Sequence, residues 1–438
     1  MSIYNKFLES IVLPLGDFVL GTKYMHHLDE WRGFQKLSSA ELKQIQKERL
    51  GYILDYACNH VPYYKKKNIE LSREAYDDIL EFPVLYKNEI KLHEDDFVVG
   101  DKSKLIVEKS SGSSGIQGQV YLSKAEASLS QAIQTLWWEW AGYKFGNAFM
   151  QTGMSPKRGV VKRIKDILLN TEYVVAYNIT EQEAADKLKK LSKKKFKHLG
   201  GYASSLYVYA SIAERNNIKD LKFDSAISWG DKMFPHYRQL LEKQFGAKVY
   251  DTYGCTEGFM IAGQCSHGQM HIMSPHVYVE ILDDDGNPVP AGQLGKVVVT
   301  RLDSFSMPLI RYYLGDLAIL APDEKKCDCG MDFPILEKII GRDTDIVKTR
   351  SNKFMIVHFF TGILEHFPEI KQFRVIQKNL DSIQFEYIKD TGFNQSVLDK
   401  ITQIIHEHLQ EKFPIEYIEV DHIPSTPSGK PQLILSQL

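Results

Sequence analysis

The sequence predicts an α/β protein: a large amino-terminal α/β domain with wound sheets and a small β subdomain, followed by a small α+β carboxy-terminal cap domain. Three observations support this fold class. The 438 residues exceed what one hydrophobic core usually organises. Short apolar runs alternate with helical stretches through the middle of the chain, which is typical of a wound sheet, and a ββαβ pattern follows near residue 342. We therefore expect one domain over residues 1–341 and a second over residues 342–438.

The first hundred residues are expected to be mainly helical. Ser38 and Glu41 have the spacing of a capping box, and apolar residues then recur at helical spacing until Pro62. The apolar run 11–15 is interrupted by a glycine and an aspartate, and no long apolar run follows. The sequence therefore predicts neither a signal peptide nor a membrane span.

Residues 101–260 are expected to form the α/β core. The elements predicted there are strands at 159–161, 173–176 and 248–250 and helices at 181–191 and 239–246. The segment that begins at Tyr253 follows the last of these strands, where α/β proteins usually place their ligand-binding loops.

The pattern then changes to alternating strands, which predicts a small β subdomain over about residues 261–340. Its predicted strands lie at 276–281 and 295–300, around a turn at 283–288. After the expected domain boundary, strands are predicted at 373–376, 382–387 and 417–420, with a helix over 398–409.

The composition is that of an ordinary globular protein, with 43% hydrophobic and 25% charged residues. A formal net charge of -2 argues against a nucleic-acid-binding protein, since such proteins usually carry a clustered basic excess. Five cysteines are an odd number, which fits a reducing compartment better than a disulfide framework. We therefore expect a cytoplasmic location.

Five short segments carry residue types that suit nucleotide binding, although each alone also fits an ordinary turn or surface loop. They are, in chain order, Ser110–Gly115, Tyr253–Glu257, Arg311–Asp316, Gly341–Asp345 and Pro424–Lys430. Unrelated loops have no reason to supply a hydroxyl-rich glycine loop, an acidic turn, an aspartate, an arginine and a terminal lysine together. The series as a whole therefore predicts a site.

The chemistry of these residues suits ATP. The backbone N–H groups and hydroxyls of the serine/glycine loop could hold phosphates, although the loop lacks the ending of a kinase-type P-loop. Tyr253 offers a ring face for a purine. Thr256 offers a hydroxyl to a phosphate oxygen, and Glu257 is a hard oxygen ligand for Mg²⁺. Asp316 could accept hydrogen bonds from ribose hydroxyls, and a turn residue is its ordinary alternative.

Together, the motifs resemble those of the adenylate-forming superfamily, which includes acyl-CoA synthetases, non-ribosomal adenylation enzymes and luciferases. In detail, the chain is similar to the phenylacetate-CoA ligase family, including its capsular-polysaccharide-associated adenylating relatives. The similarity covers nearly the whole chain, and it includes Asn59–Tyr64, Gly201–Leu206 and Cys327–Gly330. It implies two steps at one site: ATP and a carboxylic acid give an acyl-adenylate and pyrophosphate, and a thiol, normally coenzyme A, then displaces AMP.

The resemblance also implies roles for individual residues. The serine/glycine loop would hold the β- and γ-phosphates, and Thr256 and Glu257 would take the α-phosphate and Mg²⁺. Lys430 matches the lysine that neutralises charge developing between the carboxylate and the α-phosphate. The other nucleotide-binding residues so implied are Ser111, Gly112, Ser113, Ser114 and Gly115 for phosphate, Gly230, Asp231, Asp251, Tyr253 and Gly254 around the adenine, and Asp316 and Arg342 at the ribose.

Members of this family swing a mobile carboxy-terminal domain between the two half-reactions. The pivot corresponds to Thr344, where the family pattern usually has Asp or Lys, and Asp231 stands in place of a glutamate. Overall resemblance favours a small, aryl carboxylic acid as substrate and coenzyme A as acceptor. The pivot change favours transfer of an acid or amino acid to an amine, sugar or carrier protein in surface-polysaccharide or secondary-metabolite synthesis. A non-catalytic nucleotide-binding scaffold is a third interpretation.

Four further residues could bind a structural zinc ion. Cys265, His271, Cys327 and Cys329 supply three thiolates and one imidazole, the set expected for tetrahedral zinc. Reduced structural thiols are the alternative, because the Cys-x-Cys spacing is tighter than usual. Some relatives with matching cysteines look metal-bound, and His267 is the substitute ligand.

The acid itself is less well specified by the sequence. Trp137–Trp140 and Tyr143 could wall an aryl pocket, but such a cluster also fits a helix core. By family position, Gly201–Leu206 borders the acid pocket. The family resemblance favours a homodimer.

Overall fold

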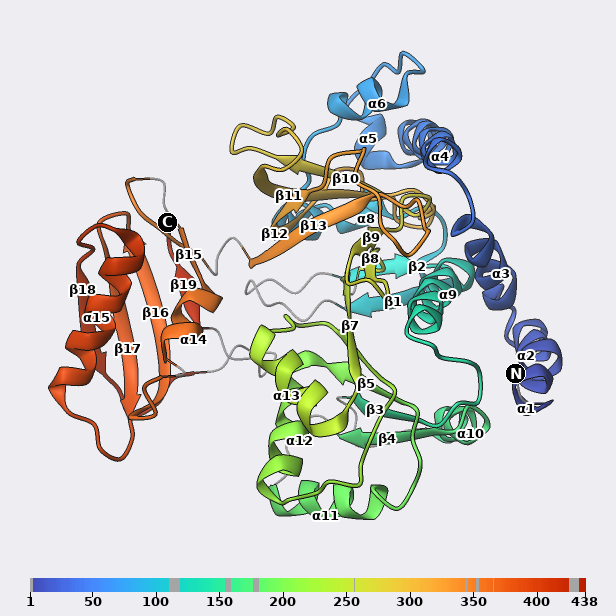
Figure 1. Ribbon diagram of the computed structural model, residues 1–438. Coiled ribbons are helices and arrows are strands. Elements are labelled where there is room, and N and C mark those ends of the chain that lie inside the picture. Colours follow the sequence, from blue (N-terminus) through green and yellow to red (C-terminus); the bar gives the residue numbers. More distant parts are fainter. Residues whose placement is uncertain are drawn as a thin grey trace.

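The computed structural model describes residues 3–109, 119–153, 159–175, 181–255, 257–342, 346–351, 354–364, 366–424 and 433–438. Figure 1 shows a large α/β body that carries the amino terminus and a smaller carboxy-terminal unit beside it. The predicted fold class is confirmed. Among the described residues, no helix combines the length and the apolar character that crossing a bilayer requires.

The first hundred residues are mainly helical, as predicted. The elements are α1 (Ile3–Phe7), the π-helical turn η1 (Leu8–Val12), α2 (Leu13–Leu20), α3 (Tyr24–Phe34), α4 (Ser39–His60), α5 (Pro62–Lys65), α6 (Ala75–Asp78), η2 (Ile79–Glu81), α7 (Lys87–Leu92), α8 (Glu94–Phe97) and η3 (Lys102–Lys104). The capping box is present: the Ser38 hydroxyl accepts from the N–H of Glu41, whose carboxylate accepts from the Ser38 N–H at 2.8 Å.

One sheet of eleven strands forms the centre of the large body. Its strands are β3 (Phe149–Gly153), β4 (Thr171–Val175), β5 (His198–Tyr202), β6 (Ser225–Trp229), β7 (Lys248–Gly254), β8 (Met260–Gln264), β9 (Met270–Ile272), β10 (Val277–Leu282), β11 (Leu294–Arg301), β12 (Tyr312–Leu320) and β13 (Ile335–Arg342). Their order is β10-β11-β12-β13-β9-β8-β7-β6-β5-β3-β4. β7 is parallel to β6 and antiparallel to β8. The strands of the expected β subdomain therefore continue the wound sheet.

The helices that precede or connect the parallel strands of this sheet are α9 (Lys124–Trp140), α10 (Val160–Leu168), α11 (Glu181–Leu191), α12 (Ala203–Arg215) and α13 (Pro235–Phe245). Strands β1 (Ile106–Lys109) and β2 (Gln119–Leu122) form a separate antiparallel pair. The strand predicted at 159–161 is wrong, because this run opens α10. Apolar residues recur there at helical spacing as far as Leu168, and the three-residue run alone was too short to show this spacing.

The tryptophan cluster lies mainly in the core. Trp137 is buried, and a Cβ added at Gly263 of β8 would lie only 2.4 Å from its indole. Trp138 stacks against Phe149 and Trp229. The structure therefore supports the helix-core interpretation for Trp137.

The carboxy-terminal unit has its own core. Its elements are β14 (Ile346–Lys348), β15 (Phe354–Ile356), α14 (Val357–Leu364), β16 (Ile370–Asn379), β17 (Ser382–Lys389), α15 (Gln395–Leu409), β18 (Ile415–Glu419) and β19 (Ile434–Ser436). The four-stranded sheet has the order β18-β17-β16-β19. Ile401 and Ile405 of α15 share one buried cluster with Phe385 of β17. The predicted ββαβ elements are all present.

Candidate nucleotide and metal sites

The end of β7 is joined to β12 by a side-chain hydrogen bond. The Tyr253 hydroxyl donates to Oδ2 of Asp316 over 2.8 Å. Asp316 also pairs through its backbone with Arg342, the last residue of β13. The fold thus brings together three residues that the sequence places in separate motifs.

Glu257 lies in a small pocket with two cations. Its side chain is only 9% exposed, the Tyr312 hydroxyl donates to its Oε1 over 3.3 Å, and Nζ of Lys87 lies 3.6 Å from the same oxygen. The pocket is also lined by Lys91 and by Gln119, the first described residue after the serine/glycine loop. Two lysines and two carboxylates, those of Glu257 and Glu94, therefore meet in one place, and carboxylate oxygens are the ligands that Mg²⁺ prefers.

Lys87 was missed by sequence reasoning. It begins α7, far from the acidic motif along the chain. A lysine at the start of a short helix carries no spacing signal, so only the fold shows its proximity to Glu257.

Asp231 and Gly230 form the turn after β6. The Asp231 carboxylate accepts from the N–H of Ala203 over 2.6 Å and from the N–H of Ser204 over 3.2 Å, so it caps the start of α12. Gly230 has φ +79°, and a Cβ there would lie 2.7 Å from the Tyr202 ring. A glycine is therefore required at this close approach. The Asp231 carboxylate therefore makes helix-capping contacts.

Asp251 connects β6 and β7 beneath the motif. Ser228 donates its hydroxyl to Oδ1 of Asp251 over 2.5 Å, and the N–H of Thr252 donates to the same oxygen over 3.0 Å. Burial raises the pKa of Asp251 to about 6, against the opposing effect of the Ser228 hydrogen bond. The carboxyl group therefore titrates close to neutral pH.

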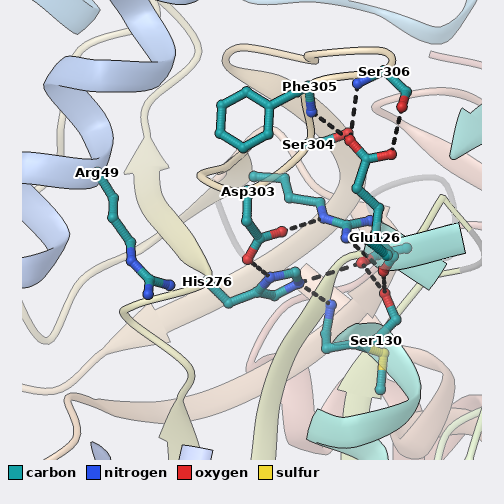
Figure 2. A network of polar contacts seen from close by, with 12 residues as sticks. Arg49, Glu126, Ser130, His276, Asp303, Ser304, Phe305 and Ser306 are labelled. Atoms are coloured by element: carbon teal, nitrogen blue, oxygen red, sulfur yellow. Dashed lines mark hydrogen bonds and ion pairs between the residues drawn. The ribbon is translucent and has the colours of Figure 1, made fainter. Parts of the chain in front are cut away.

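A buried polar network supports the loop after Glu257 (Figure 2). Nδ1 of His276 lies 2.6 Å from Oδ2 of Asp303, and Nε of Arg301 donates to Oδ1 over 2.7 Å. Nε2 of His276 accepts from the N–H of Met260 over 3.2 Å. Burial alone would raise the pKa of Asp303, but the two neighbouring groups lower it to about 2. Asp303 is therefore a charged anchor behind the acidic motif.

Glu126 extends this network to α9. Its Oε1 accepts from the N–H groups of Phe305 and Ser306 over 2.5 and 2.9 Å, and its Oε2 accepts from the Ser306 hydroxyl over 2.6 Å. Arg301 donates to the Glu126 carbonyl over 3.0 Å. The loop after β11 is thus fixed to α9. No sequence pattern predicts these contacts.

The structure brings the four predicted zinc ligands together. The ligand atoms of Cys265, His271, Cys327 and Cys329 all lie within 4.8 Å of one another. The Sγ atoms of Cys265 and Cys327 are 3.6 Å apart, and Sγ of Cys329 is 3.2 Å from Nε2 of His271. Tetrahedral zinc with bonds of about 2.0–2.3 Å separates its ligands by roughly 3.3–3.8 Å. The arrangement therefore fits a zinc ion.

The surroundings of the cluster also fit a metal centre. Nδ1 of His271 lies 3.2 Å from the Phe333 carbonyl, so a proton on Nδ1 leaves Nε2 as the ligand atom. Burial lowers the pKa of His271, which favours the neutral imidazole. The N–H of His267 donates to Sγ of Cys265 over 3.4 Å. His271 is therefore the better-placed histidine, and His267 contributes its backbone.

Several predicted residues lie outside the described part of the chain. They are Ser111, Gly112, Ser113, Ser114, Gly115, Thr256, Thr344 and Lys430. Arg342 is described through its backbone, and Gly254 ends β7. A Cβ added at Gly254 would lie 2.5 Å from the Phe259 carbonyl oxygen, so the turn into the motif requires a glycine.

Comparison with known proteins finds relatives of this chain. A sequence family described as the CapK C-terminal domain matches residues 347–437. Protein CapK of Staphylococcus aureus is 22% identical, and the match covers 100% of this chain and 99% of that protein. The phenylacetate-coenzyme A ligase of Thermus thermophilus is 23% identical over 72% of this chain and 74% of the ligase. These matches confirm the predicted resemblance to the adenylate-forming superfamily.

A solved structure has the same overall fold. The 2-hydroxyisobutyryl-CoA ligase in its postadenylation state, in complex with R3-HIB-AMP, superposes with a TM-score of 0.72 and 19% identity, over 92% of this chain and 91% of the ligase. The sequence predicts an enzyme of the acid–thiol ligase type. The relatives named as coenzyme A ligases confirm this prediction. The individual site residues stay predictions.

Proposed function

We propose that this protein activates a small, aryl carboxylic acid with ATP and transfers the acyl group to coenzyme A. In the first step a carboxylate oxygen attacks the α-phosphorus, and pyrophosphate leaves. In the second step the thiolate of coenzyme A attacks the acyl carbonyl carbon, and AMP leaves with the carboxylate oxygen. The names of the relatives as CoA ligases support this proposal.

The hydrogen bond between Tyr253 and Asp316, with Glu257 four residues beyond Tyr253, carries the proposal. Tyr253 would face the base, and Asp316 would accept from the ribose hydroxyls. Glu257 offers an oxygen to Mg²⁺ that is bound to the phosphates, and Lys87 adds a cation 3.6 Å from that oxygen. Bound Mg²⁺ would neutralise phosphate charge, while the side chains orient the nucleotide.

The experiment is pyrophosphate exchange with a panel of arylacetates, hydroxybenzoates, fatty acids and amino acids. We expect exchange with one class of acid, and loss of roughly 10²–10³ in rate in a Lys430→Ala variant that keeps its fold. Absence of exchange with every acid would favour the scaffold interpretation. Near-normal exchange by the lysine variant would exclude the role proposed for Lys430.

An acyl acceptor other than coenzyme A is the alternative proposal. The full-length match to Protein CapK supports it, because that match extends further along this chain than the match to the phenylacetate-coenzyme A ligase. On that alternative, the activated acid or amino acid passes to an amine, sugar or carrier protein. AMP release with and without coenzyme A separates the two proposals. Stimulation by coenzyme A supports the first, and indifference to it supports the second.

We also propose that the cysteine and histidine cluster holds a structural zinc ion. It would tie the β8–β9 hairpin to the loop before β13, because Cys265 and His271 lie on one segment and Cys327 and Cys329 on the other.

The match of the family domain from residue 347 supports the proposed domain boundary near residue 342.

A further inference from the structure

Helices α1 and α2 and the turn between them leave a row of apolar side chains in solvent. Phe18 is 83% exposed, and the other exposed members of the row are Ile3, Tyr4, Phe7, Ile11, Leu15, Val19 and Leu20. Leu8 is fully buried on the opposite side. Amphipathic surface helices normally turn their apolar stripe toward the core, so an outward stripe indicates a binding surface.

Helix α10 presents a second exposed row beside the first. Ile164, Ile167 and Leu168 follow helical spacing, and Ile167 is 78% exposed. The Tyr4 hydroxyl donates to the Leu168 carbonyl over 2.6 Å. Because Tyr4 and Leu168 are themselves partly exposed, the two rows adjoin. Figure 1 shows α1, α2 and α10 together at the outer edge of the large body, away from the carboxy-terminal unit.

Charge is distributed unequally around these rows. Exposed basic side chains flank them, namely Lys6, Lys23, Lys124, Lys162, Arg163 and Lys165. Nζ of Lys124 donates to the Leu20 carbonyl over 3.0 Å at the end of α2. The acidic side chains of α1, η1 and α2 are engaged within the chain: Glu9 pairs with Arg32 at 2.6 Å, and Asp17 accepts from the N–H groups of Tyr24 and Met25. Asp166 of α10 is partly buried.

We propose that this surface docks on an anionic lipid bilayer, with α1, η1, α2 and α10 lying in the interface. Aromatic and aliphatic side chains would enter the headgroup and acyl boundary, while the flanking lysines and arginine would reach the charged headgroups. Charge complementarity favours an anionic bilayer over a second copy of the chain, which would set the same basic side chains against one another.

Vesicle flotation of the full-length protein tests this proposal. We expect binding to vesicles of phosphatidylglycerol and phosphatidylcholine, weaker binding to phosphatidylcholine alone, and weaker binding at high salt. Phe18→Glu and Ile167→Glu should each lower the partition coefficient roughly tenfold. Val208→Glu, at a 47% exposed position on α12, is the matched control and should bind normally.

Three results would overturn the proposal. The first is the absence of binding to anionic vesicles at low ionic strength, and the second is equal binding by all variants. The third is a wild-type protein that does not bind vesicles and sediments as a dimer, which Phe18→Glu converts to a monomer; this result would assign the surface to a second copy. Pyrophosphate exchange in solution should be unchanged in the three variants, so a failure of the proposed function is distinguished from a failure of the docking proposal.

Discussion

The hydroxyl of Tyr253 and the carboxylate of Asp316 are hydrogen-bonded over 2.8 Å, although they lie on different strands of the sheet. The bond orients the carboxylate relative to the tyrosine ring. A carboxylate has about four acceptor positions, so the bond from the phenol does not by itself prevent a ribose hydroxyl from binding. The residue proposed for the base therefore also positions the residue proposed for the sugar.

Tyr253→Phe keeps the ring and removes this bond. Hydrogen bonds to charged groups contribute roughly 1.5–3 kcal/mol, so the KM for ATP should rise at least about tenfold. Steady-state pyrophosphate exchange measures it. Tyr52→Phe, on the exposed face of α4, is the control. An unchanged KM for ATP in Tyr253→Phe would show that the bond has no part in nucleotide binding.

Lys87→Gln removes the cation that lies 3.6 Å from Glu257. If Lys87 contacts the nucleotide phosphates, the KM for ATP should increase about tenfold, since one charge-assisted contact is lost. Lys43→Gln tests the general effect of removing a lysine, because Lys43 is 65% exposed and pairs with Asp323. Equal kinetics for the two variants would contradict a role for Lys87.

Asp251 makes stability depend on pH. Its pKa is raised from an ordinary value near 4 to about 6, so the folded state holds more protons than the unfolded state between these values. Stability is therefore lost as the pH rises through this window. Asp251→Asn should gain about 2–3 kcal/mol relative to wild type between pH 4 and pH 7.5, as measured by urea unfolding. A constant difference between the two proteins across that range would argue against the shift.

Asp303→Asn tests the buried network of Figure 2. The substitution leaves the fully buried Arg301 without its charged partner, which should cost roughly 3–5 kcal/mol in the free energy of unfolding. Urea unfolding at pH 7 measures the loss. Asp323→Asn, at an 86% exposed side chain, should change little. A loss below about 1 kcal/mol in Asp303→Asn would show that the network relaxes readily.

Removal of zinc should destabilise the packing of the β8–β9 segment against the loop before β13. Protein purified without chelator should contain about one equivalent of zinc by elemental analysis, and a chelator should lower the Tm. Cys329→Ser should lose the metal, whereas Cys58→Ser on α4 should retain it. Less than about a tenth of an equivalent in the wild-type protein would rule out the zinc proposal.

Sequence-based prediction is possible where chemistry or periodicity marks a residue. Tyr253 and Asp316 were selected as residue types suited to a nucleotide, and the four zinc candidates by their ligand atoms; the fold brings each set together. Contacts between distant segments are not indicated by residue type or spacing. The capping role of Asp231 and the proximity of Lys87 to Glu257 depend on how β6, α12 and α7 pack.

Errors came from short patterns. The run 159–161 contains two valines, which favour strands, but the following residues extend its apolar period into α10. The sequence also did not indicate that the strands of the β subdomain join the wound sheet through β7, which pairs on both of its sides. The alternation of apolar and polar residues identifies individual strands but does not predict which strands pair.

That double pairing of β7 has an evolutionary consequence. Tyr253, near its end, pairs with β8 and is joined through Asp316 to β12, whereas the loop after β5 belongs to the parallel half. Mutations that reshape the loop after β5 are therefore expected to leave the tyrosine and aspartate pair in place. On the proposed function, a lineage built on this strand is able to change the acid that it activates and still bind ATP in the same way.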